Sequence, residues 1–171
     1  MAAAAPSSGD TLLARWSGLW RAGPERPALV AGADPGNRLN GGALDDLTAR
    51  AAGHFAAVGV APGERVLWSC AATIDSVVAL LGALRMGAVV VPVSPSCTAS
   101  ELAYVIADAA PAMAVVERDE QRAWVAATGR ALPVLSPSDV GSAVAARDTP
   151  DLDAARPGGD ALIVYTSGTT G

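Results

Sequence analysis

The residues best suited to chemistry stand together at the end of the sequence. Residues 165–171 read Tyr-Thr-Ser-Gly-Thr-Thr-Gly, a run of four small hydroxyl side chains and two glycines after a tyrosine. Glycine lets the backbone curl so that successive N–H groups converge on one anion, and serine and threonine hydroxyls donate to phosphate oxygens. The candidate ligand-binding residues are therefore Thr166, Ser167, Gly168, Thr169, Thr170 and Gly171. The Gly-Lys-Ser/Thr ending of a Walker A loop is absent, and the same composition also occurs in flexible tails.

Other reactive side chains are scattered, so we expect no acid, base, nucleophile or metal ligand among them. Cys70 and Cys97 lack metal-ligand spacing, and His54, the single histidine, cannot complete a zinc set. We expect the cysteines to be small buried residues and His54 to be an ordinary helix residue. Asp45-Asp46 and Asp119-Glu120 are neighbours in sequence, which point to different faces of a helix and therefore predict no paired acid–base site.

Composition limits the class of protein. The chain has 171 residues, of which 51% are hydrophobic and 17% charged, which excludes an intrinsically disordered protein. The net charge of −5 argues against nucleic-acid binding, although backbone N–H groups and hydroxyls still suit a nucleotide ligand. The most apolar stretch, residues 76–93, contains Arg85 and Gly87 and is too short to span a membrane. Residues 1–10 do not resemble a signal peptide, and we expect a cytoplasmic protein.

Hydrophobic periodicity predicts helices that alternate with short apolar strands. We expect helices at residues 11–21, 43–58, 73–87, 98–111, 118–127 and 138–146. We expect strands at residues 28–31, 65–70, 88–93, 112–116, 132–135 and 160–165, the last one buried. This alternation is typical of an α/β fold with a mostly parallel sheet and flanking helices. Residues 1–9 are expected to be a mobile Ala-rich tail and residues 147–159 an exposed connection.

Capping residues predict where several helices begin and end. Asp10 and Thr73 are expected N-caps, and Thr98 to Glu101 form the pattern of a capping box. Gly59 is expected to end a helix in the left-handed conformation, and Gly87 is expected to end the next helix. Arg85 interrupts an apolar helix near its end, where we expect it to extend to solvent or to pair.

The strand that precedes residues 165–171 carries this loop to the strand end where α/β sheets bind ligands. Tyr165–Gly171 resembles, at all seven positions, the opening of the phosphate loop of the AMP-forming acyl-CoA synthetases. Their adenylate-forming (ANL) superfamily includes luciferases and peptide-synthetase adenylation domains. Three upstream blocks resemble the family in the same order: residues 59–66, residues 84–92, and residues 101–104 with Asp108 and Pro111. The resemblance covers roughly residues 25–171 and departs locally at residues 39–41, where the family often has Leu-Thr-Tyr.

The resemblance implies a fold and a function. Residues 10–171 would be an incomplete domain, the first part of the large N-terminal AMP-binding domain. The complete enzyme would convert a small-molecule carboxylic acid and ATP to an acyl-adenylate and pyrophosphate, and then form a thioester with coenzyme A. Mg²⁺ would bridge the phosphates, and Thr166–Gly171 would hold the β- and γ-phosphates of ATP. In the family the substrate carboxylate is the nucleophile, so we assign no catalytic residue.

Two alternatives remain open from the sequence. The sequence stops before the Pro-Lys-Gly half of the loop and contains no lysine, so we expect an N-terminal fragment that is inactive alone. Such a chain could instead be a non-catalytic α/β remnant or an interaction module, with exposed apolar surface that favours self-association. The complete enzyme could also deliver the acyl group to a carrier-protein thiol, because the acceptor-binding region lies beyond Gly171.

Overall fold

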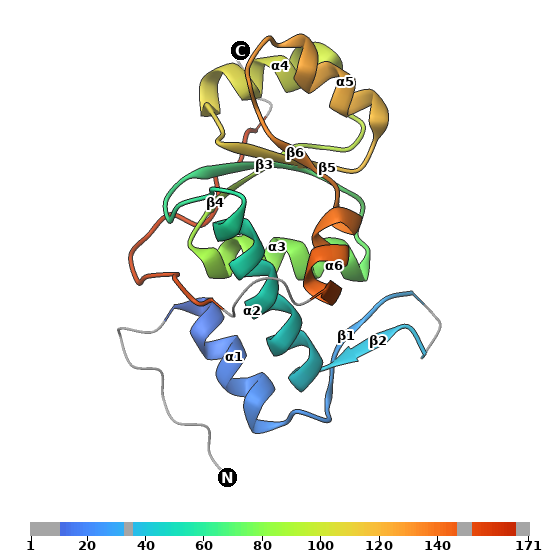
Figure 1. Ribbon diagram of the computed structural model, residues 1–171, viewed down its shortest axis with the longest axis vertical. Helices are drawn as coiled ribbons and strands as arrows, with labels where there is room; N and C mark the ends of the chain where they lie inside the picture. The colour runs from blue at the N-terminus through green and yellow to red at the C-terminus, as the bar shows by residue number, and fades with distance from the viewer. Residues whose placement is uncertain (1–10, 33–35, 147–151, 167–171) are drawn as a thin grey trace.

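Two layers of helices enclose a four-stranded sheet in this computed structural model, which describes residues 11–32, 36–146 and 152–166. The strands, in their order across the sheet, are β4 (Val89–Pro92), β3 (Arg65–Ser69), β5 (Met113–Val116) and β6 (Val134–Leu135). One face is covered by α4 (Ala99–Ala109) and α5 (Asp119–Ala127). The other is covered by α2 (Gly41–Ala57), α3 (Ile74–Met86) and α6 (Pro137–Ala146) (Figure 1).

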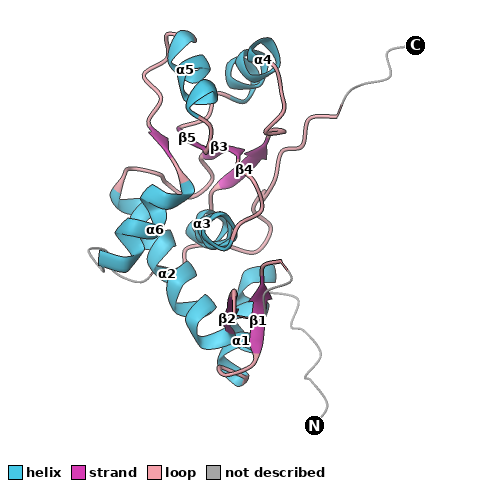
Figure 2. Cartoon of the chain, turned by 90° about the vertical axis from the view of Figure 1, so that its right-hand side faces the viewer, coloured by secondary structure: helices cyan, strands magenta, loops and turns pink. Residues whose placement is uncertain are grey.

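A helix and a hairpin lie outside these layers. Helix α1 (Leu12–Ala22) packs on α2, and β1 (Pro27–Val30) pairs antiparallel with β2 (Arg38–Asn40), whose end leads directly into α2 (Figure 2). In the four-stranded sheet all pairs are parallel, with Val66 level with both Val90 and Met113. The predicted α/β fold with a mostly parallel sheet is therefore confirmed.

Alternation along the strands divides the core between the two faces. In β3, Val66 and Trp68 pack against the α2–α3–α6 layer, whereas Leu67 packs against α4 and α5. Helix α3 is buried on most sides between the sheet and α2, and a Cβ added at Gly82 would lie only 2.4 Å from the Cβ of Ala51. This close approach brings the backbones of the two helices together.

Helix caps agree with the sequence at most positions. Thr73 and Thr98 form capping boxes, and Gly59 and Gly87 adopt the left-handed conformation with φ of 97° and 85°. Thr11, rather than Asp10, caps α1, because the Oγ1 of Thr11 accepts from the N–H of Ala14 at 3.0 Å. Asp10 itself lies outside the described residues.

Helix α2 begins two residues before the predicted start. The amide oxygen of Asn40 accepts from the N–H of Ala43 at 2.8 Å and makes Asn40 the N-cap. The apolar stripe from which the helix was predicted starts only at Leu44, because a hydrophobic stripe marks the buried face of a helix and not its first turn.

The prediction of a buried strand at residues 160–165 is wrong. Only Leu162 forms a bridge to β4, next to two backbone hydrogen bonds that join Val90 to Ala161 and Ile163. The side chains of Leu162 and Val164 are 54% and 63% exposed. The apolar run predicted a buried strand, but the segment pairs with β4 at one bridge and packs Ile163 and Tyr165 toward the α4 layer, and its other face is exposed.

The connection before this segment is held to the layer of α2 and α3. The N–H of Leu152 donates to the carbonyl of Ala49, and the N–H groups of Ala154 and Ala155 both donate to the carbonyl of Arg85. Residues 156–159 are exposed, as the sequence predicts for the whole of 147–159, but Leu152, Ala154 and Ala155 are half-buried. Residues 147–151 and the predicted tail at residues 1–9 lie outside the described residues.

Candidate functional site

The candidate site lies at the carboxyl edge of the parallel sheet. Residues 160–166 run parallel to β4, so Thr166 leaves the sheet at the same edge as the end of β4. A groove of about 680 Å³ opens there beside the beginning of α4. It is lined by Pro92, Val93, Ser94, Ser96, Cys97, Ser100, Glu101, Tyr104, Val105, Tyr165 and Thr166. Ligands of α/β proteins bind at this edge because the loops that follow the strands meet there.

Of the predicted phosphate-binding residues, the structure describes one. Thr166 is exposed and lines the groove, where the predicted loop begins. The other five predicted residues, Ser167, Gly168, Thr169, Thr170 and Gly171, lie outside the described residues. The structure therefore places Thr166 at the carboxyl edge of the parallel sheet.

Hydroxyl groups from the β4–α4 loop form one wall of the groove. The Oγ atoms of Ser94 and Ser96 lie 2.8 Å apart, and the Oγ1 of Thr98 lies 3.1 Å from the Oγ of Ser100. The sequence patterns assigned no function to residues 94–96, so this wall was not predicted. The density of serine and threonine between residues 94 and 100 was the signal available for finding it.

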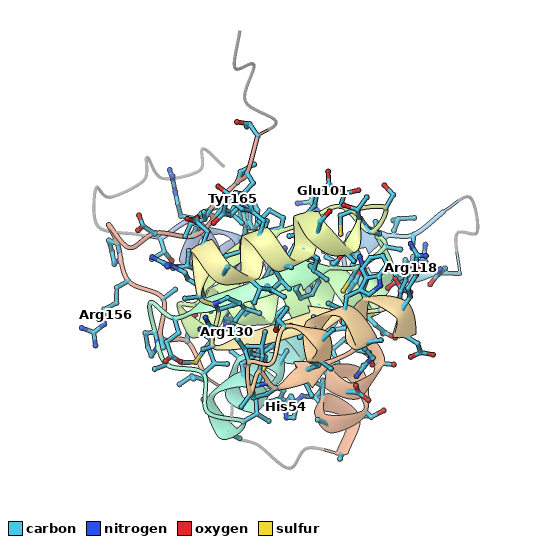
Figure 3. The ribbon with its side chains drawn as sticks, turned by 90° about the horizontal axis from the view of Figure 1, so that it is seen from above. His54, Glu101, Arg118, Arg130, Arg156 and Tyr165 are labelled. Atoms are coloured by element: carbon cyan, nitrogen blue, oxygen red, sulfur yellow. The ribbon has the colours of Figure 1, made fainter. Side chains whose placement is uncertain are left out.

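Glu101 lines the groove but already has partners. Its carboxylate accepts from the backbone N–H of Thr98 at 2.7 Å and from the Oγ1 of Thr98 at 2.9 Å. These two hydrogen bonds, the backbone one foremost, lower the pKa of Glu101, so the carboxylate is ionised at neutral pH. Figure 3 shows Glu101 and Tyr165 along the same side of α4.

Two side chains at the beginning of α5 hold the β4–α4 loop in place. The guanidinium of Arg118 donates to the carbonyl of Pro95 at 2.8 Å. The amide of Gln121, which is fully buried, also donates to this carbonyl at 3.4 Å and contacts the Sγ of Cys97 at 3.5 Å. The groove is thus bounded by a loop with several tertiary contacts.

Tyr165, the residue before the predicted loop, packs on α4. Its hydroxyl donates to the Oδ2 of Asp108, and its ring meets Tyr104 edge-on with centroids 6.2 Å apart. The hydrogen bond to the Asp108 carboxylate is the main reason that the pKa of Tyr165 rises to about 12. In the sequence, Tyr104 and Asp108 are evident only as positions that resemble the family, and no contact with Tyr165 is predicted.

Arg85 fixes the beginning of the segment that ends in Thr166. It is 2% exposed and donates to the Oδ1 of Asp45 at 2.8 Å and to the Oγ1 of Thr48 at 3.0 Å. It also forms an ion pair with Asp153 at 3.3 Å. Pairing is one of the two outcomes that the sequence predicts for Arg85, although the side chain is buried and does not extend to solvent.

Asp45 is the common partner in this network. Burial alone would raise its pKa, but hydrogen bonds from Arg21, Ser17 and Arg85 outweigh burial and lower it. Asp46, its neighbour in sequence, pairs instead with Arg50. The two carboxylates therefore serve separate structural contacts, as expected for adjacent helix residues.

The remaining reactive side chains lie apart from the groove or are inert. Burial raises the pKa of the Cys70 thiol to about 12 and lowers the pKa of His54. Figure 3 shows His54 and Tyr165 on opposite sides of the molecule.

Within residues 11–32, 36–146 and 152–166, no three His, Cys, Asp or Glu side chains are grouped as metal ligands. Within the same ranges, every helix is too short or too polar to cross a bilayer.

The comparison with protein families decides the identity of the chain. The family model described as "AMP-binding enzyme" matches residues 19–171. The chain belongs to this family of AMP-binding enzymes. The match includes both the groove and the loop that begins at Thr166, and it confirms the resemblance to adenylate-forming enzymes.

Known proteins support this assignment from sequence and structure. Surfactin synthase subunit 3 of Bacillus subtilis is 30% identical over 152 residues, which are 88% of this chain and 11% of that protein. Long-chain-fatty-acid–CoA ligase FadD13 of Mycobacterium tuberculosis is 28% identical over 165 residues, 85% of this chain and 31% of that protein. The crystal structure of VinN superposes with a TM-score of 0.80 at 25% identity and covers 95% of this chain and 42% of VinN. The chain thus spans less than half the length of each of these relatives.

Proposed function

We propose that this chain is the N-terminal part of an ATP-dependent, AMP-forming ligase that activates a small carboxylic acid in the cytoplasm and transfers it to coenzyme A. One observation carries the proposal. Thr166, the first of the six predicted phosphate-binding residues, stands at the carboxyl edge of a parallel sheet beside a groove lined with hydroxyl groups. This is where an α/β fold presents backbone N–H groups and hydroxyls to a phosphate.

In this proposal, residues 166–171 hold the β- and γ-phosphates of ATP. Their hydroxyls and backbone N–H groups are donors without positive charge, which suits phosphate oxygens. They would orient the polyphosphate so that the substrate carboxylate attacks the α-phosphorus in line with the leaving pyrophosphate. Mg²⁺, when bound, neutralises charge on the phosphates. The described residues contain no group of three His, Cys, Asp or Glu side chains that could hold it, so phosphate oxygens and water would be its main ligands.

Relatives of this chain do not distinguish between two kinds of acyl acceptor. Surfactin synthase subunit 3 and the fatty-acid–CoA ligase match this chain at 30% and 28% identity, which is no basis for preferring either class. Delivery to a carrier-protein thiol is therefore the alternative to coenzyme A. Assay of both acceptors on the same acyl-adenylate would separate them.

One observation favours a second candidate, a non-catalytic interaction module. Residues 160–166 lie at the edge of the sheet, and their face turned away from α4 exposes Leu162 and Val164 to solvent. Exposed apolar edge segments are sites of association between chains. In this alternative the chain would associate through this edge and would not bind ATP.

Titration of the 171-residue chain with MgATP and with inorganic tripolyphosphate tests the proposal. We expect a Kd of about 1 mM for both ligands, since a short loop of neutral donors supplies only a few charge-assisted hydrogen bonds. The triple variant Ser167→Ala, Thr169→Ala, Thr170→Ala should lose this binding. The matched control Ser142→Ala removes an exposed hydroxyl from α6 and should bind as the unaltered chain does.

Catalysis requires a separate measurement. We expect the 171-residue chain to show no acid-dependent exchange of pyrophosphate into ATP. The nucleotide sequence after codon 171 and the intact mass of the native protein show whether a longer product exists, and the same assay then applies to that product.

In the binding experiment, equal binding of tripolyphosphate by the triple variant and the unaltered chain would refute the assignment of residues 166–171.

A further inference from the structure

The backbone of residues 164–166 needs a tertiary contact to hold it in place. Within the described part of the chain, the hydrogen bonds between this segment and β4 all involve Val90 and end at Ile163. The exposed side chains of Leu162 and Val164 alternate with Ile163 and Tyr165, which pack toward the α4 layer. The position of Thr166 therefore depends on the side chain of Tyr165.

Two contacts join Tyr165 to α4. The phenol hydroxyl donates to the Oδ2 of Asp108, and the ring lies edge-on to Tyr104 at an interplanar angle of 85°. Tyr104 and Asp108 are four residues apart, so they lie on the same face of the helix one turn from each other. Together they fix both the position and the direction of the Tyr165 side chain.

Helix α4 is a firm support for these contacts. The capping box of Thr98 and Glu101 fixes its first turn, and Leu102 and Ile106 are fully buried beneath it. At its other end, the guanidinium of Arg65 in β3 donates to the carbonyl of Ala109 at 2.7 Å. A side chain bound to this helix is therefore held relative to the whole sheet.

We propose that Asp108 is a positioning residue for the phosphate loop, because its hydrogen bond to Tyr165 sets the place and direction in which the chain leaves the sheet at Thr166. This inference rests on the proposed function of residues 166–171. Asp108 does not touch the ligand. It acts through Tyr165, and Tyr104 provides the surface on which the Tyr165 ring packs.

The position of Asp108 on its own helix supports a role beyond helix stability. Asp108 lies in the last turn of α4, where the carbonyl groups carry partial negative charge and a carboxylate is unfavourable. Replacement by alanine should therefore leave α4 as stable or more stable. The same replacement removes the acceptor for the Tyr165 hydroxyl, so ligand binding is expected to weaken without a loss of stability.

The test measures MgATP and tripolyphosphate binding by the 171-residue chain and three variants: Tyr165→Phe, Asp108→Ala and the double variant. We expect each single variant to bind both ligands about fivefold more weakly, the effect of one lost hydrogen bond to a charged group at a partly exposed site. The double variant should bind no more weakly than the single variants, because both remove the same hydrogen bond. Hydrogen exchange at the Ile163 amide, which donates to the carbonyl of Val90, should become faster in all three.

The matched control is Asp119→Ala, at the beginning of α5. It removes the same negative charge as Asp108→Ala without contacting Tyr165. Loss of a negative charge by itself favours anion binding. We therefore expect Asp119→Ala to bind MgATP and tripolyphosphate at least as tightly as the unaltered chain, whereas Asp108→Ala should bind them more weakly.

The outcomes distinguish this inference from the proposed function. Weaker binding by Asp108→Ala with an unchanged or raised Tm supports positioning by Asp108. Equal binding by the unaltered chain, Tyr165→Phe and Asp108→Ala would refute the inference and leave the proposed function intact. A fall in Tm that matches the fall in affinity would give Asp108 a structural role and also refute it. No binding by the unaltered chain would refute both.

Discussion

At the scale of single residues, the buried guanidinium of Arg85 needs carboxylate partners to offset the loss of its hydration. It joins α3 to Asp45 of α2 and to Asp153 of the connection that leads to Thr166. Its backbone carbonyl accepts from Ala154 and Ala155, so one residue holds this connection by side chain and main chain together. A buried charge is stable only while its partners are present.

Replacement of Arg85 by methionine should therefore destabilise the fold. We expect the free energy of unfolding to fall by about 3 kcal/mol, because the Asp45 carboxylate would lose its buried partner. Urea denaturation measures this change. Arg156→Met is the control, since Figure 3 shows the Arg156 side chain extending away from the ribbon, and it should change stability by less than about 0.5 kcal/mol. Equal effects of the two substitutions would contradict the role of Arg85.

The lowered pKa of Asp45 predicts a dependence of stability on pH. Its folded-state pKa lies below the ordinary value of 3.8, so the ionised form stabilises the fold above that pH. This contribution is lost as the pH falls through the lower, folded-state value. We expect the stability difference between the unaltered chain and Asp45→Asn to shrink as the pH falls below about 4. A difference that stays constant from pH 7 to pH 2 would show that the Asp45 charge contributes nothing.

At the scale of elements, the contact between α2 and α3 depends on two small residues. Any side chain at Gly82 would overlap Ala51, whose own exposure is 0%. Both helices also cover the face of the sheet to which Trp68 and Val90 contribute their side chains. Separation of the two helices would therefore disturb the packing of this whole layer.

Gly82→Ala is expected to lower the free energy of unfolding by about 2 kcal/mol, through overpacking of this crossing. Gly18→Ala is the matched substitution, because α1 has open space around Gly18 and nothing lies within 4 Å of an added Cβ. It should stabilise the chain by about 0.5 to 1 kcal/mol, since alanine favours helix over glycine. Chemical denaturation of both variants measures the contrast, and the same sign for both would refute the steric argument.

At the scale of the whole molecule, the described residues leave the β4 side of the sheet incompletely covered. Beyond β4, residues 160–166 add one bridge and leave Leu162 and Val164 exposed, while β6 ends the sheet on the opposite side. Exposed apolar edge segments pair with other chains. This edge provides a structural reason for the self-association that the sequence predicts.

We expect the 171-residue chain to associate with itself as its concentration rises, and the double variant Leu162→Lys, Val164→Lys to do so less. Charged side chains at an exposed edge oppose pairing between chains. Sedimentation velocity at several concentrations measures the effect. Leu19→Lys, at a residue of α1 that is 65% exposed, is the control for a general gain in charge. A monomeric unaltered chain at all concentrations would refute the prediction.

Much of the fold followed from local patterns in the sequence. The alternation of helices and strands, the caps at Thr73 and Thr98 and the helix end at Gly87 depend on residues close together along the chain. The hydroxyl-rich loop that begins at Thr166 was also evident, because its chemistry lies in consecutive residues. Local steric and hydrogen-bonding rules were sufficient for these features.

Only the tertiary structure decided the features that join distant parts of the chain. The strand order β4-β3-β5-β6, the pairing of Arg85 with Asp45 and Asp153, and the hydrogen bond between Tyr165 and Asp108 all bring together residues far apart in sequence. The exposure of Leu162 was predicted wrongly for the same reason. An apolar run shows that a segment can be buried, but whether it is buried depends on which other segments pack against it.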